Sequence, residues 1–263
     1  MTLKNNIFFA LLAAACAFTS CNNENEPEAG YGELQLTLDS EEEIISVQSK
    51  AQPSEQQLAS YLLTVTQGGE VVMNQERYST KVVNGKMGMK AGEGYVLTAE
   101  SSTEADAETA EEGWGKARFS GSSEPFDIEL RKLTSVSVLC TMQNAKVTVS
   151  YDRSFSSTFT DYNVEVYETS APGRTLSFSP MSNILTPCAY FNIDADPQLT
   201  YVIKGRINGG EKKTLYQGTV ELASAKWCKL VCRATPSGKA EMTVVIDNTV
   251  EDKDENIDIN PYN

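Results

Sequence analysis

From Tyr31 onward, apolar and polar residues alternate along most of the chain. In the segment GELQLTL, this alternation places Leu34, Leu36 and Leu38 on one face. A period of two residues is typical of half-buried antiparallel β-strands. Turn signals such as Asn84-Gly85 separate the alternating segments, so we predict an all-β chain. The same alternation predicts three more inward-facing sets: Phe126, Ile128 and Leu130; Val147, Val149 and Tyr151; and Met242, Val244 and Ile246.

Two segments depart from this alternation. In PSEQQLASYLL, Ser54 and Gln57 have the spacing of a helix capping box, which predicts a short helix. The overlapping segment YLLTV fits a strand equally well. Residues 101–113 are rich in acidic residues and alanine, and we expect them to form a loop between two strands.

A weak internal repeat indicates two domains. Residues 90–101 are similar to residues 194–208, and residues 118–142 are similar to residues 215–234. Residues 118–142 are followed by the valine-rich segment KVTVSYD, and residues 215–234 by MTVVID, and both segments end in aspartate. This pattern suggests that the chain supplies its own closing strand, and it favours a monomer. We therefore predict two tandem antiparallel β-sandwich domains, followed by an acidic strand or tail. The expected limits are residues 31–143, 144–250 and 251–263.

The amino-terminal segment has the features of an export signal. Lys4 precedes an apolar stretch at residues 7–17, which is shorter than the roughly 20 residues that a membrane-spanning helix needs. Ser20 is small, and Cys21 follows it at the position where lipoprotein maturation attaches a diacylglyceryl group. We predict that residues 1–20 are a lipoprotein signal peptide, that Cys21 is lipidated, and that residues 21–30 form an acidic tether. One alternative is lipidation at Cys16, which however lies inside the apolar stretch, and another is a plain secretory signal with an incidental cysteine.

The charge of the chain and its lack of histidine exclude several classes of function. The chain has 36 acidic and 22 basic residues, a formal charge of -14 and no histidine. An acidic surface repels nucleic acid and anionic lipid headgroups, so nucleic-acid binding is not expected. Without histidine, neither a Ser-His-Asp triad nor a histidine-ligated metal site can form. We expect no cofactor, no metal and no catalytic residue.

Four cysteines remain after Cys21 in an exported chain that could oxidise them: Cys140, Cys188, Cys228 and Cys232. Disulfides and buried free thiols are both open interpretations. Cys228 and Cys232 share a strand face at a separation of about 13 Å, which exceeds the roughly 7 Å that a disulfide tolerates. These two should not pair with each other.

Trp114, within EEGWGKARF, is the candidate ligand contact. Its indole could stack on a sugar ring, although a tryptophan folded onto the sandwich is the simpler interpretation. The neighbouring Glu111 and Glu112 are adjacent in sequence, so they are poorly placed to act as the separated acid pair of a glycosidase. The alternating acids of DKDENID resemble a calcium loop only faintly, because Ile257 occupies the position where that loop needs glycine.

A series of motifs runs through nearly the whole chain after residue 30, and its order resembles a domain-of-unknown-function family of Bacteroidales cell-surface lipoproteins. The resemblance implies tandem β-sandwich domains of immunoglobulin or transthyretin type on a lipid anchor, and no established activity. A looser resemblance is to fimbrillin-type pilus proteins. The residues that carry the family resemblance are Gly32, Leu34 and Leu36; Ala91, Gly92, Tyr95, Leu97, Ala99 and Ser101; Trp114 to Gly121; Val136, Val138 and Cys140; Lys146 to Asp152, Phe155, Phe159, Tyr162, Val164 and Val166; and the ending VIDNTVEDKDENIDI.

These observations predict a non-catalytic, lipid-anchored protein of the outer membrane. The acidic run of Glu24, Glu26 and Glu28 resembles the signal that sends lipoproteins of these bacteria to the cell exterior. The first hypothesis is an adhesion or interaction module that binds a protein or glycan. The alternatives are a fimbria-like subunit assembled by strand donation, and a glycan-binding accessory lipoprotein.

Overall fold

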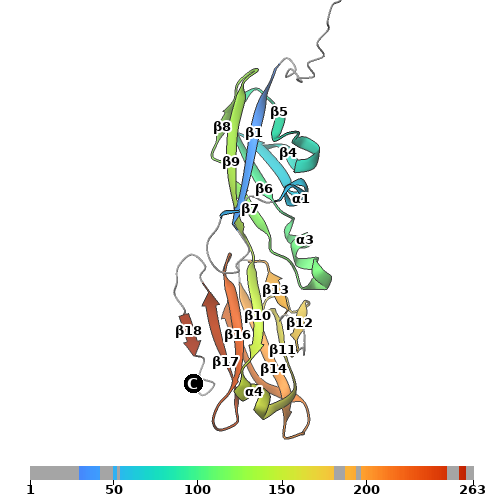
Figure 1. Cartoon of the computed structure of the whole chain (residues 1–263), viewed down its shortest axis with the longest axis vertical. Coiled ribbons are helices and arrows are strands. Elements are labelled where there is room, and N and C mark those ends of the chain that lie inside the picture. The colour runs from blue at the N-terminus through green and yellow to red at the C-terminus, as the bar shows by residue number, and fades with distance from the viewer. Residues whose placement is uncertain are drawn as a thin grey trace, which may run out of the picture.

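The computed structural model describes residues 30–41, 50–51, 54–180, 187–193, 197–247 and 255–258. In these residues, strands far outnumber helices, which confirms the all-β prediction. Figure 1 shows an elongated molecule in which two groups of strands are stacked end to end. The signal peptide, Cys21 and most of the acidic tether lie outside the described residues.

The first strand group contains β1 to β9 and is built on one branched sheet. Its strand order is β2-β1-β9-β7-β6-β3-β4, with β5 paired to β1 and β8 paired to β6. The strands are β1 (Tyr31–Glu41), β2 (Lys50–Ala51), β3 (Leu62–Gln67), β4 (Glu70–Arg77), β5 (Lys86–Lys90), β6 (Gly92–Glu100), β7 (Phe119–Ser122), β8 (Phe126–Ile128) and β9 (Leu133–Met142). The helices are α1 (Glu55–Ser60), α2 (Tyr78–Lys81), α3 (Glu104–Thr109) and the 3-10 turn η1 (Glu111–Gly113).

The second strand group contains β10 to β18 and is built from two sheets. Their orders are β13-β10-β16-β17-β18 and β12-β11-β14-β15. The strands are β10 (Ala145–Tyr151), β11 (Phe159–Glu168), β12 (Thr175–Phe178), β13 (Cys188–Phe191), β14 (Gln198–Ile207), β15 (Lys213–Glu221), β16 (Trp227–Ala234), β17 (Ala240–Asp247) and β18 (Glu255–Asp258), with helix α4 (Arg153–Thr158).

Each strand group has its own hydrophobic core. The predicted inward face of β1 is confirmed, because Leu34, Leu36 and Leu38 are all buried. In the second core, Val147, Val149, Met242 and Val244 are buried, while Tyr151 and Ile246 pack partly buried against them. The two cores draw on residues 34–140 and 145–244 respectively, and the domain limits at 143 and 144 remain a proposal.

Leu130 does not face the core, so its predicted placement was wrong. Strand β8 ends at Ile128, which is buried, and Leu130 follows in the turn before β9 with 53% of its surface exposed. The two-residue alternation continues through this turn although the strand does not. Alternation shows which face a side chain takes only while the backbone stays extended.

Two strand pairs are parallel in an otherwise antiparallel arrangement of the described strands. β1 runs parallel to β9, and β10 runs parallel to β16. In both groups, the opening strand therefore lies beside a strand from near the end of the same group. β10 does not close the first group, as the repeat had suggested, but opens the second by pairing with β13 and β16.

Helical residues occur where the sequence departed from alternation. The capping box of Ser54 and Gln57 is present at the start of α1, and β3 begins two residues after that helix ends, so both expectations for this segment are met. The loop expected at residues 101–113 is instead α3 followed by η1. The Thr103 side chain caps α3 by accepting a hydrogen bond from the amide of Asp106, and Ala107 is fully buried beneath it.

Candidate functional site at the junction of the two strand groups

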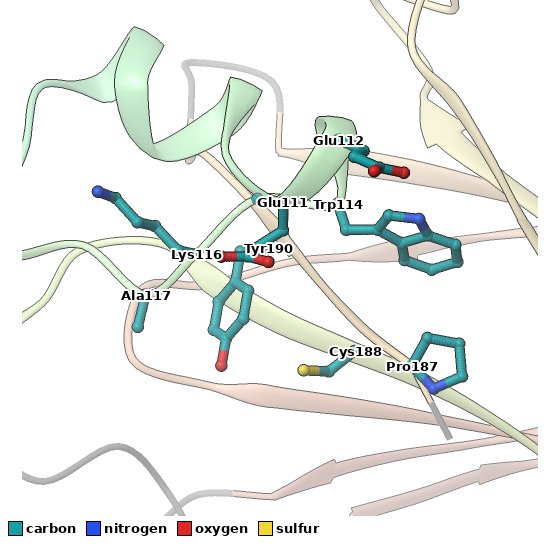
Figure 2. Close-up of a pocket in the computed structure, with 9 residues that line it drawn as sticks. Glu111, Glu112, Trp114, Lys116, Ala117, Pro187, Cys188 and Tyr190 are labelled. Atoms are coloured by element: carbon teal, nitrogen blue, oxygen red, sulfur yellow. The ribbon is translucent and has the colours of Figure 1, made fainter. Parts of the chain in front are cut away.

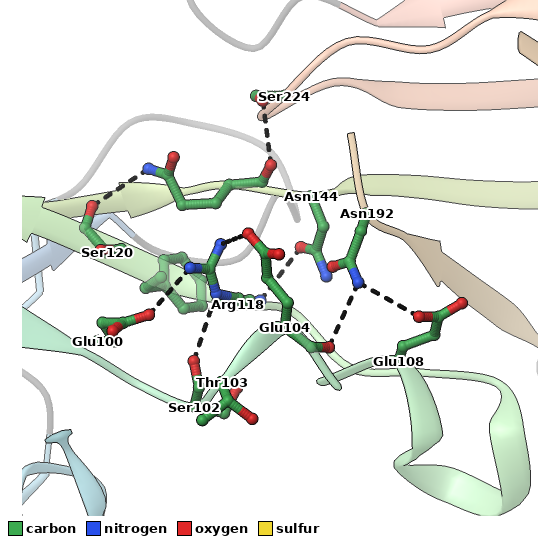
Figure 3. Close-up of polar contacts among 12 residues, drawn as sticks. Glu100, Ser102, Thr103, Glu104, Glu108, Arg118, Ser120, Asn144, Asn192 and Ser224 are labelled. Carbon is green, nitrogen blue, oxygen red and sulfur yellow. Dashed lines mark hydrogen bonds and ion pairs between the residues drawn. The ribbon is translucent and has the colours of Figure 1, made fainter. Parts of the chain in front are cut away.

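The segment from α3 to Arg118 leaves the first strand group and lies against β13 of the second. We call residues 101–118 the junction arm. At its carboxyl end, Arg118 forms ion pairs with Glu100 at 2.9 Å and with Glu104 at 3.3 Å. Its guanidinium also donates to the carbonyl of Ser102 at 3.3 Å. These contacts, drawn in Figure 3, fold the arm back on itself and fix both of its ends.

Asn144, between β9 and β10, links the arm to the point where the chain passes from one group to the other. Its side-chain oxygen Oδ1 accepts from the backbone amide of Arg118 at 3.1 Å, and its side-chain nitrogen Nδ2 donates to the carbonyl of Lys116 at 2.8 Å. Asn144 is buried, and both of its polar atoms are therefore satisfied by backbone of the arm. One residue earlier, the carbonyl of Gln143 accepts from Ser224 at 3.0 Å, as Figure 3 shows.

Arg174, just before β12, holds the arm from the second strand group. It donates to the carbonyl of Gly113 and to that of Tyr190, each at 2.8 Å. Its guanidinium also lies 3.5 Å from the Glu108 carboxylate and 4.6 Å from the ring centre of Phe191. Burial lowers the pKa of Arg174, and the nearby carboxylates act in the opposite direction. A cation with this many fixed contacts is a rigid link between the two groups.

Asn192, directly after β13, makes two weaker contacts with α3. Its side-chain nitrogen lies 3.3 Å from the carbonyl of Glu104 and 3.4 Å from the Glu108 carboxylate. Figure 3 shows the asparagine reaching across to the helix. Three side chains that the sequence analysis did not single out, Arg174, Asn144 and Asn192, therefore place the arm.

A pocket of about 550 Å³ opens between the junction arm and β13. The arm contributes the side chains of Glu111, Glu112, Trp114 and Lys116, and Figure 2 shows Cys188 and Tyr190 facing them from β13. Its lining consists of Glu111, Glu112, Trp114, Gly115, Lys116, Ala117, Pro187, Cys188 and Tyr190. The pocket thus combines aromatic and apolar walls with two exposed carboxylates and one exposed ammonium group.

Trp114 is folded onto the second sandwich and also lines the pocket. Its ring meets Phe178 edge to face, with centroids 4.9 Å apart, and its carbonyl accepts from the amide of Tyr190 at 2.9 Å. The folded interpretation and the pocket interpretation are therefore compatible, because the indole is only partly buried.

The backbone around Trp114 is held in an unusual conformation. Glu111 and Glu112 have φ values of 50° and 56°, and Gly113 and Gly115 also have positive φ. Each non-glycine residue in this region costs roughly 1–2 kcal/mol. At Gly115, a Cβ atom would lie 2.8 Å from the carbonyl oxygen of Tyr190, so a side chain there would separate the arm from β13. Strained backbone of this kind persists where surrounding contacts impose it. Here Arg174 bonds the carbonyl of Gly113 within the strained turn, and Asn144 holds the backbone of Lys116 and Arg118 just after it.

All four cysteines in the described residues are free thiols. Cys140, Cys228 and Cys232 are buried in the cores, whereas Cys188 is half-buried at the pocket. Burial raises the pKa of Cys140 and Cys228 to about 12, and it also raises the pKa of Cys232. These three thiols stay protonated and are poor nucleophiles at neutral pH.

No group of three or more cysteine, aspartate or glutamate side chains in the described part of the chain is placed to hold a metal ion. Over the same residues, the structure contains no helix that is both long and apolar enough to cross a bilayer.

Comparison with known proteins identifies a family for nearly the whole chain. Residues 28–261 match the model of a domain of unknown function, DUF4493. No curated protein matches the chain in sequence. Among solved structures, the fold is similar to the fimbrial anchor protein Mfa2 from Porphyromonas gingivalis, at 9% identity and a TM-score of 0.44 over 82% of this chain and 97% of that one. It is also similar to a fimbrial assembly protein from Parabacteroides distasonis, at 10% identity and a TM-score of 0.48 over 86% of this chain and 98% of that one.

Proposed function

The chain belongs to the DUF4493 family, and we propose that it is a non-catalytic, lipid-anchored adhesion module that displays the junction pocket on the exterior of the outer membrane. The observation that carries this proposal is the way the pocket is built. Arg174 and Asn144 hold a strained loop so that Trp114, Glu111 and Glu112 line one wall. A preorganised, partly exposed aromatic side chain beside polar groups is typical of a recognition site.

The lining favours a glycan as the ligand. The exposed part of an indole offers an apolar face to the C–H groups of a sugar ring, and carboxylates accept hydrogen bonds from hydroxyl groups. The pocket provides both kinds of contact on one loop, through Trp114 and the neighbouring Glu111 and Glu112. A protein partner remains compatible with the same surface, since tryptophan is also a common anchor at protein interfaces.

Two observations support a non-catalytic role. The three buried thiols have raised pKa values, and burial keeps substrates away from them. In the pocket, Glu111 and Glu112 are consecutive residues of a single turn, so they cannot face each other across a scissile bond.

A second candidate function is a fimbria-like subunit that exchanges a strand. The observation behind it is β18, a strand of four residues at the edge of its sheet, which among the described strands pairs with β17 alone. A short terminal edge strand is the kind of element that a neighbouring subunit can replace. The two candidates predict different behaviour on gels.

The test uses outer-membrane material from cells that produce the wild-type chain or its Cys21→Ala variant, run on gels with and without heating. A tethered monomer gives a single membrane-bound band, which becomes soluble in the variant and is removed by protease added to intact wild-type cells. A ladder that collapses on heating would instead support the strand-exchange subunit. A variant that stays on the membrane would contradict the lipid anchor.

A further inference from the structure

Exposed apolar side chains gather at the end of the first strand group where the described chain begins. Tyr31 opens β1, and 39% of its surface is exposed. Leu130 and Leu133, in and just after the turn between β8 and β9, are 53% and 48% exposed. We call these three residues, with Arg131 and Lys132 between the two leucines, the N-terminal tip.

The tip is fixed rather than loose. The amide of Arg131 donates to the carbonyl of Tyr31 at 3.0 Å, and the amide of Glu33 donates to the carbonyl of Lys132 at 2.9 Å. At Gly32, a Cβ atom would lie 2.3 Å from the carbonyl oxygen of Glu129, which shows how closely β1 and the turn approach. These backbone contacts therefore fix the positions of β1 and the turn relative to each other, and the three apolar side chains are exposed there.

The hairpin between β3 and β4 adds two valines at the same end. Gln67, the last residue of β3, pairs with Tyr95 near the start of β6 and donates to the carbonyl of Glu93. Val71 and Val72 follow the turn and are 57% and 54% exposed. Five of the eight large apolar side chains that are exposed in the described residues thus lie near this end of the molecule.

The charges at this end nearly balance, in contrast to the acidic chain as a whole. The cations at this end are Lys86, Lys90, Arg131 and Lys132, and two of them form ion pairs, Lys86 with Glu33 and Lys132 with Glu129. The described carboxylates nearest to this end are those of Glu33, which pairs with Lys86, and of Glu70, Glu93, Asp127 and Glu129. The described residues at this end therefore add little net charge, in contrast to the formal charge of -14 on the full chain.

We propose that the N-terminal tip rests on the outer-membrane lipid surface, with Tyr31, Leu130 and Leu133 at the headgroup level. This inference rests on the proposed lipid anchor at Cys21. Nine peptide units separate Cys21 from Gly30, so even a fully extended tether reaches only about 30 Å. The tip is the first described part of the chain after that tether. Apolar and aromatic side chains gain free energy at the membrane interface, and an exposed apolar patch marks such a contact.

The arrangement would set the height of the junction pocket. β1 starts at the tip and runs towards the junction, as Figure 1 shows. Its 11 residues span about 35 Å at the rise of an extended strand. With the tip on the membrane, the long axis of the molecule stands away from the lipid, and the pocket faces outward, clear of the headgroups.

The test places one extra tryptophan at each of two exposed positions of β9. Leu133→Trp lies at the tip, and Leu139→Trp lies on the same face six residues further along, where Leu139 is 40% exposed. The lipidated full chains are reconstituted into phosphatidylethanolamine vesicles containing brominated lipid, which quenches nearby indoles, and the wild-type emission of Trp114 and Trp227 is subtracted. For a side chain at headgroup depth, we expect the brominated lipid to weaken the emission of the added indole at position 133 roughly twofold. The emission of the added indole at position 139 should not be quenched.

Flotation of the same vesicles separates the two proposals. If the wild-type chain floats and the two added tryptophans are quenched equally, the tip does not lie on the membrane, whereas the anchor stands. If the lipidated wild type fails to float, both the anchor and the tip contact are wrong. As a further check, Leu130→Asp with Leu133→Asp should lift the tip and expose the amides of residues 130–133 to hydrogen exchange on vesicles, while Leu139→Asp should leave their protection unchanged.

Discussion

Arg174 donates a 2.8 Å hydrogen bond to the carbonyl of Gly113, across 61 positions of sequence. The bond joins the second strand group to the loop that carries Trp114, and the same guanidinium donates to the carbonyl of Tyr190 on β13. One side chain thus holds both walls of the junction pocket. The pocket depends on how the two strand groups are joined, rather than on either group alone.

Replacing Arg174 with alanine should destabilise the junction. The change removes two charge-assisted hydrogen bonds and leaves two carbonyls without their partner, which should cost about 2–4 kcal/mol of unfolding free energy. Urea unfolding measures the loss. Arg206→Ala is the matched control, because Arg206 pairs with Asp161 on an exposed surface, where water screens the pair and it contributes little to stability. Equal losses in the two variants would contradict a special role for Arg174.

Asn144→Ala should weaken the junction from the other side. The variant removes the partner of the partly buried amide of Arg118 and of the carbonyl of Lys116, at a total cost of about 1–3 kcal/mol. Asn192→Ala should cost far less, since its contacts are 3.3 and 3.4 Å long. Calorimetric melting compares the two, and a larger effect at Asn192 would show that the arm is held mainly through α3.

Gly121→Ala should disturb the pairing of β7 with β9. A Cβ atom at Gly121 would lie 2.1 Å from the carbonyl oxygen of Leu139, so the strands must separate, with an expected cost of about 1–3 kcal/mol. Gly88→Ala in β5 is the control, because nothing lies within 4 Å of the added atom. If both variants unfold at the same denaturant concentration, the close approach of these two strands is wrong.

Thiol reactivity tests the burial of the cysteines. In the native protein with the proposed lipid on Cys21, a maleimide reagent should label Cys188 and leave Cys140, Cys228 and Cys232 unmodified even at pH 9, since burial raises the pKa of those three thiols. All four should react after unfolding in guanidinium. Mass spectrometry counts the labels, and two or more on the native chain would mean that a core is open or a strand is displaced.

The strands were largely predictable from sequence, because alternation directly reports a half-buried pleat, as at Leu34, Leu36 and Leu38. The parallel pairing of β1 with β9 could not be predicted from sequence, since alternation shows which face of a strand is buried but not which strand lies alongside it. Leu130 shows the opposite failure, in which the alternation continued beyond the strand. Thr103 followed by acidic residues and alanines was a usable signal for α3 that the interpretation as a loop overlooked.

The candidate site was predictable only in part. Trp114 stood out because a tryptophan between glycines and acids is unusual in a polar loop. Arg174 and Asn144 carried no local signal, since each acts on backbone that lies far away in sequence. Residues that position a site through long-range contacts become visible only once the strands are paired.

The most direct test of the central claim is affinity electrophoresis of the wild-type chain in native gels containing mucin, arabinoxylan or yeast mannan. Trp114→Ala is run beside it, together with Tyr167→Ala, a change in β11 outside the pocket lining. The expected result is that at least one polysaccharide retards the wild type and the Tyr167 variant, while the folded Trp114 variant migrates as it does in a plain gel. Retardation that survives the loss of Trp114, or none for the wild type in any gel, would contradict glycan recognition by the junction pocket.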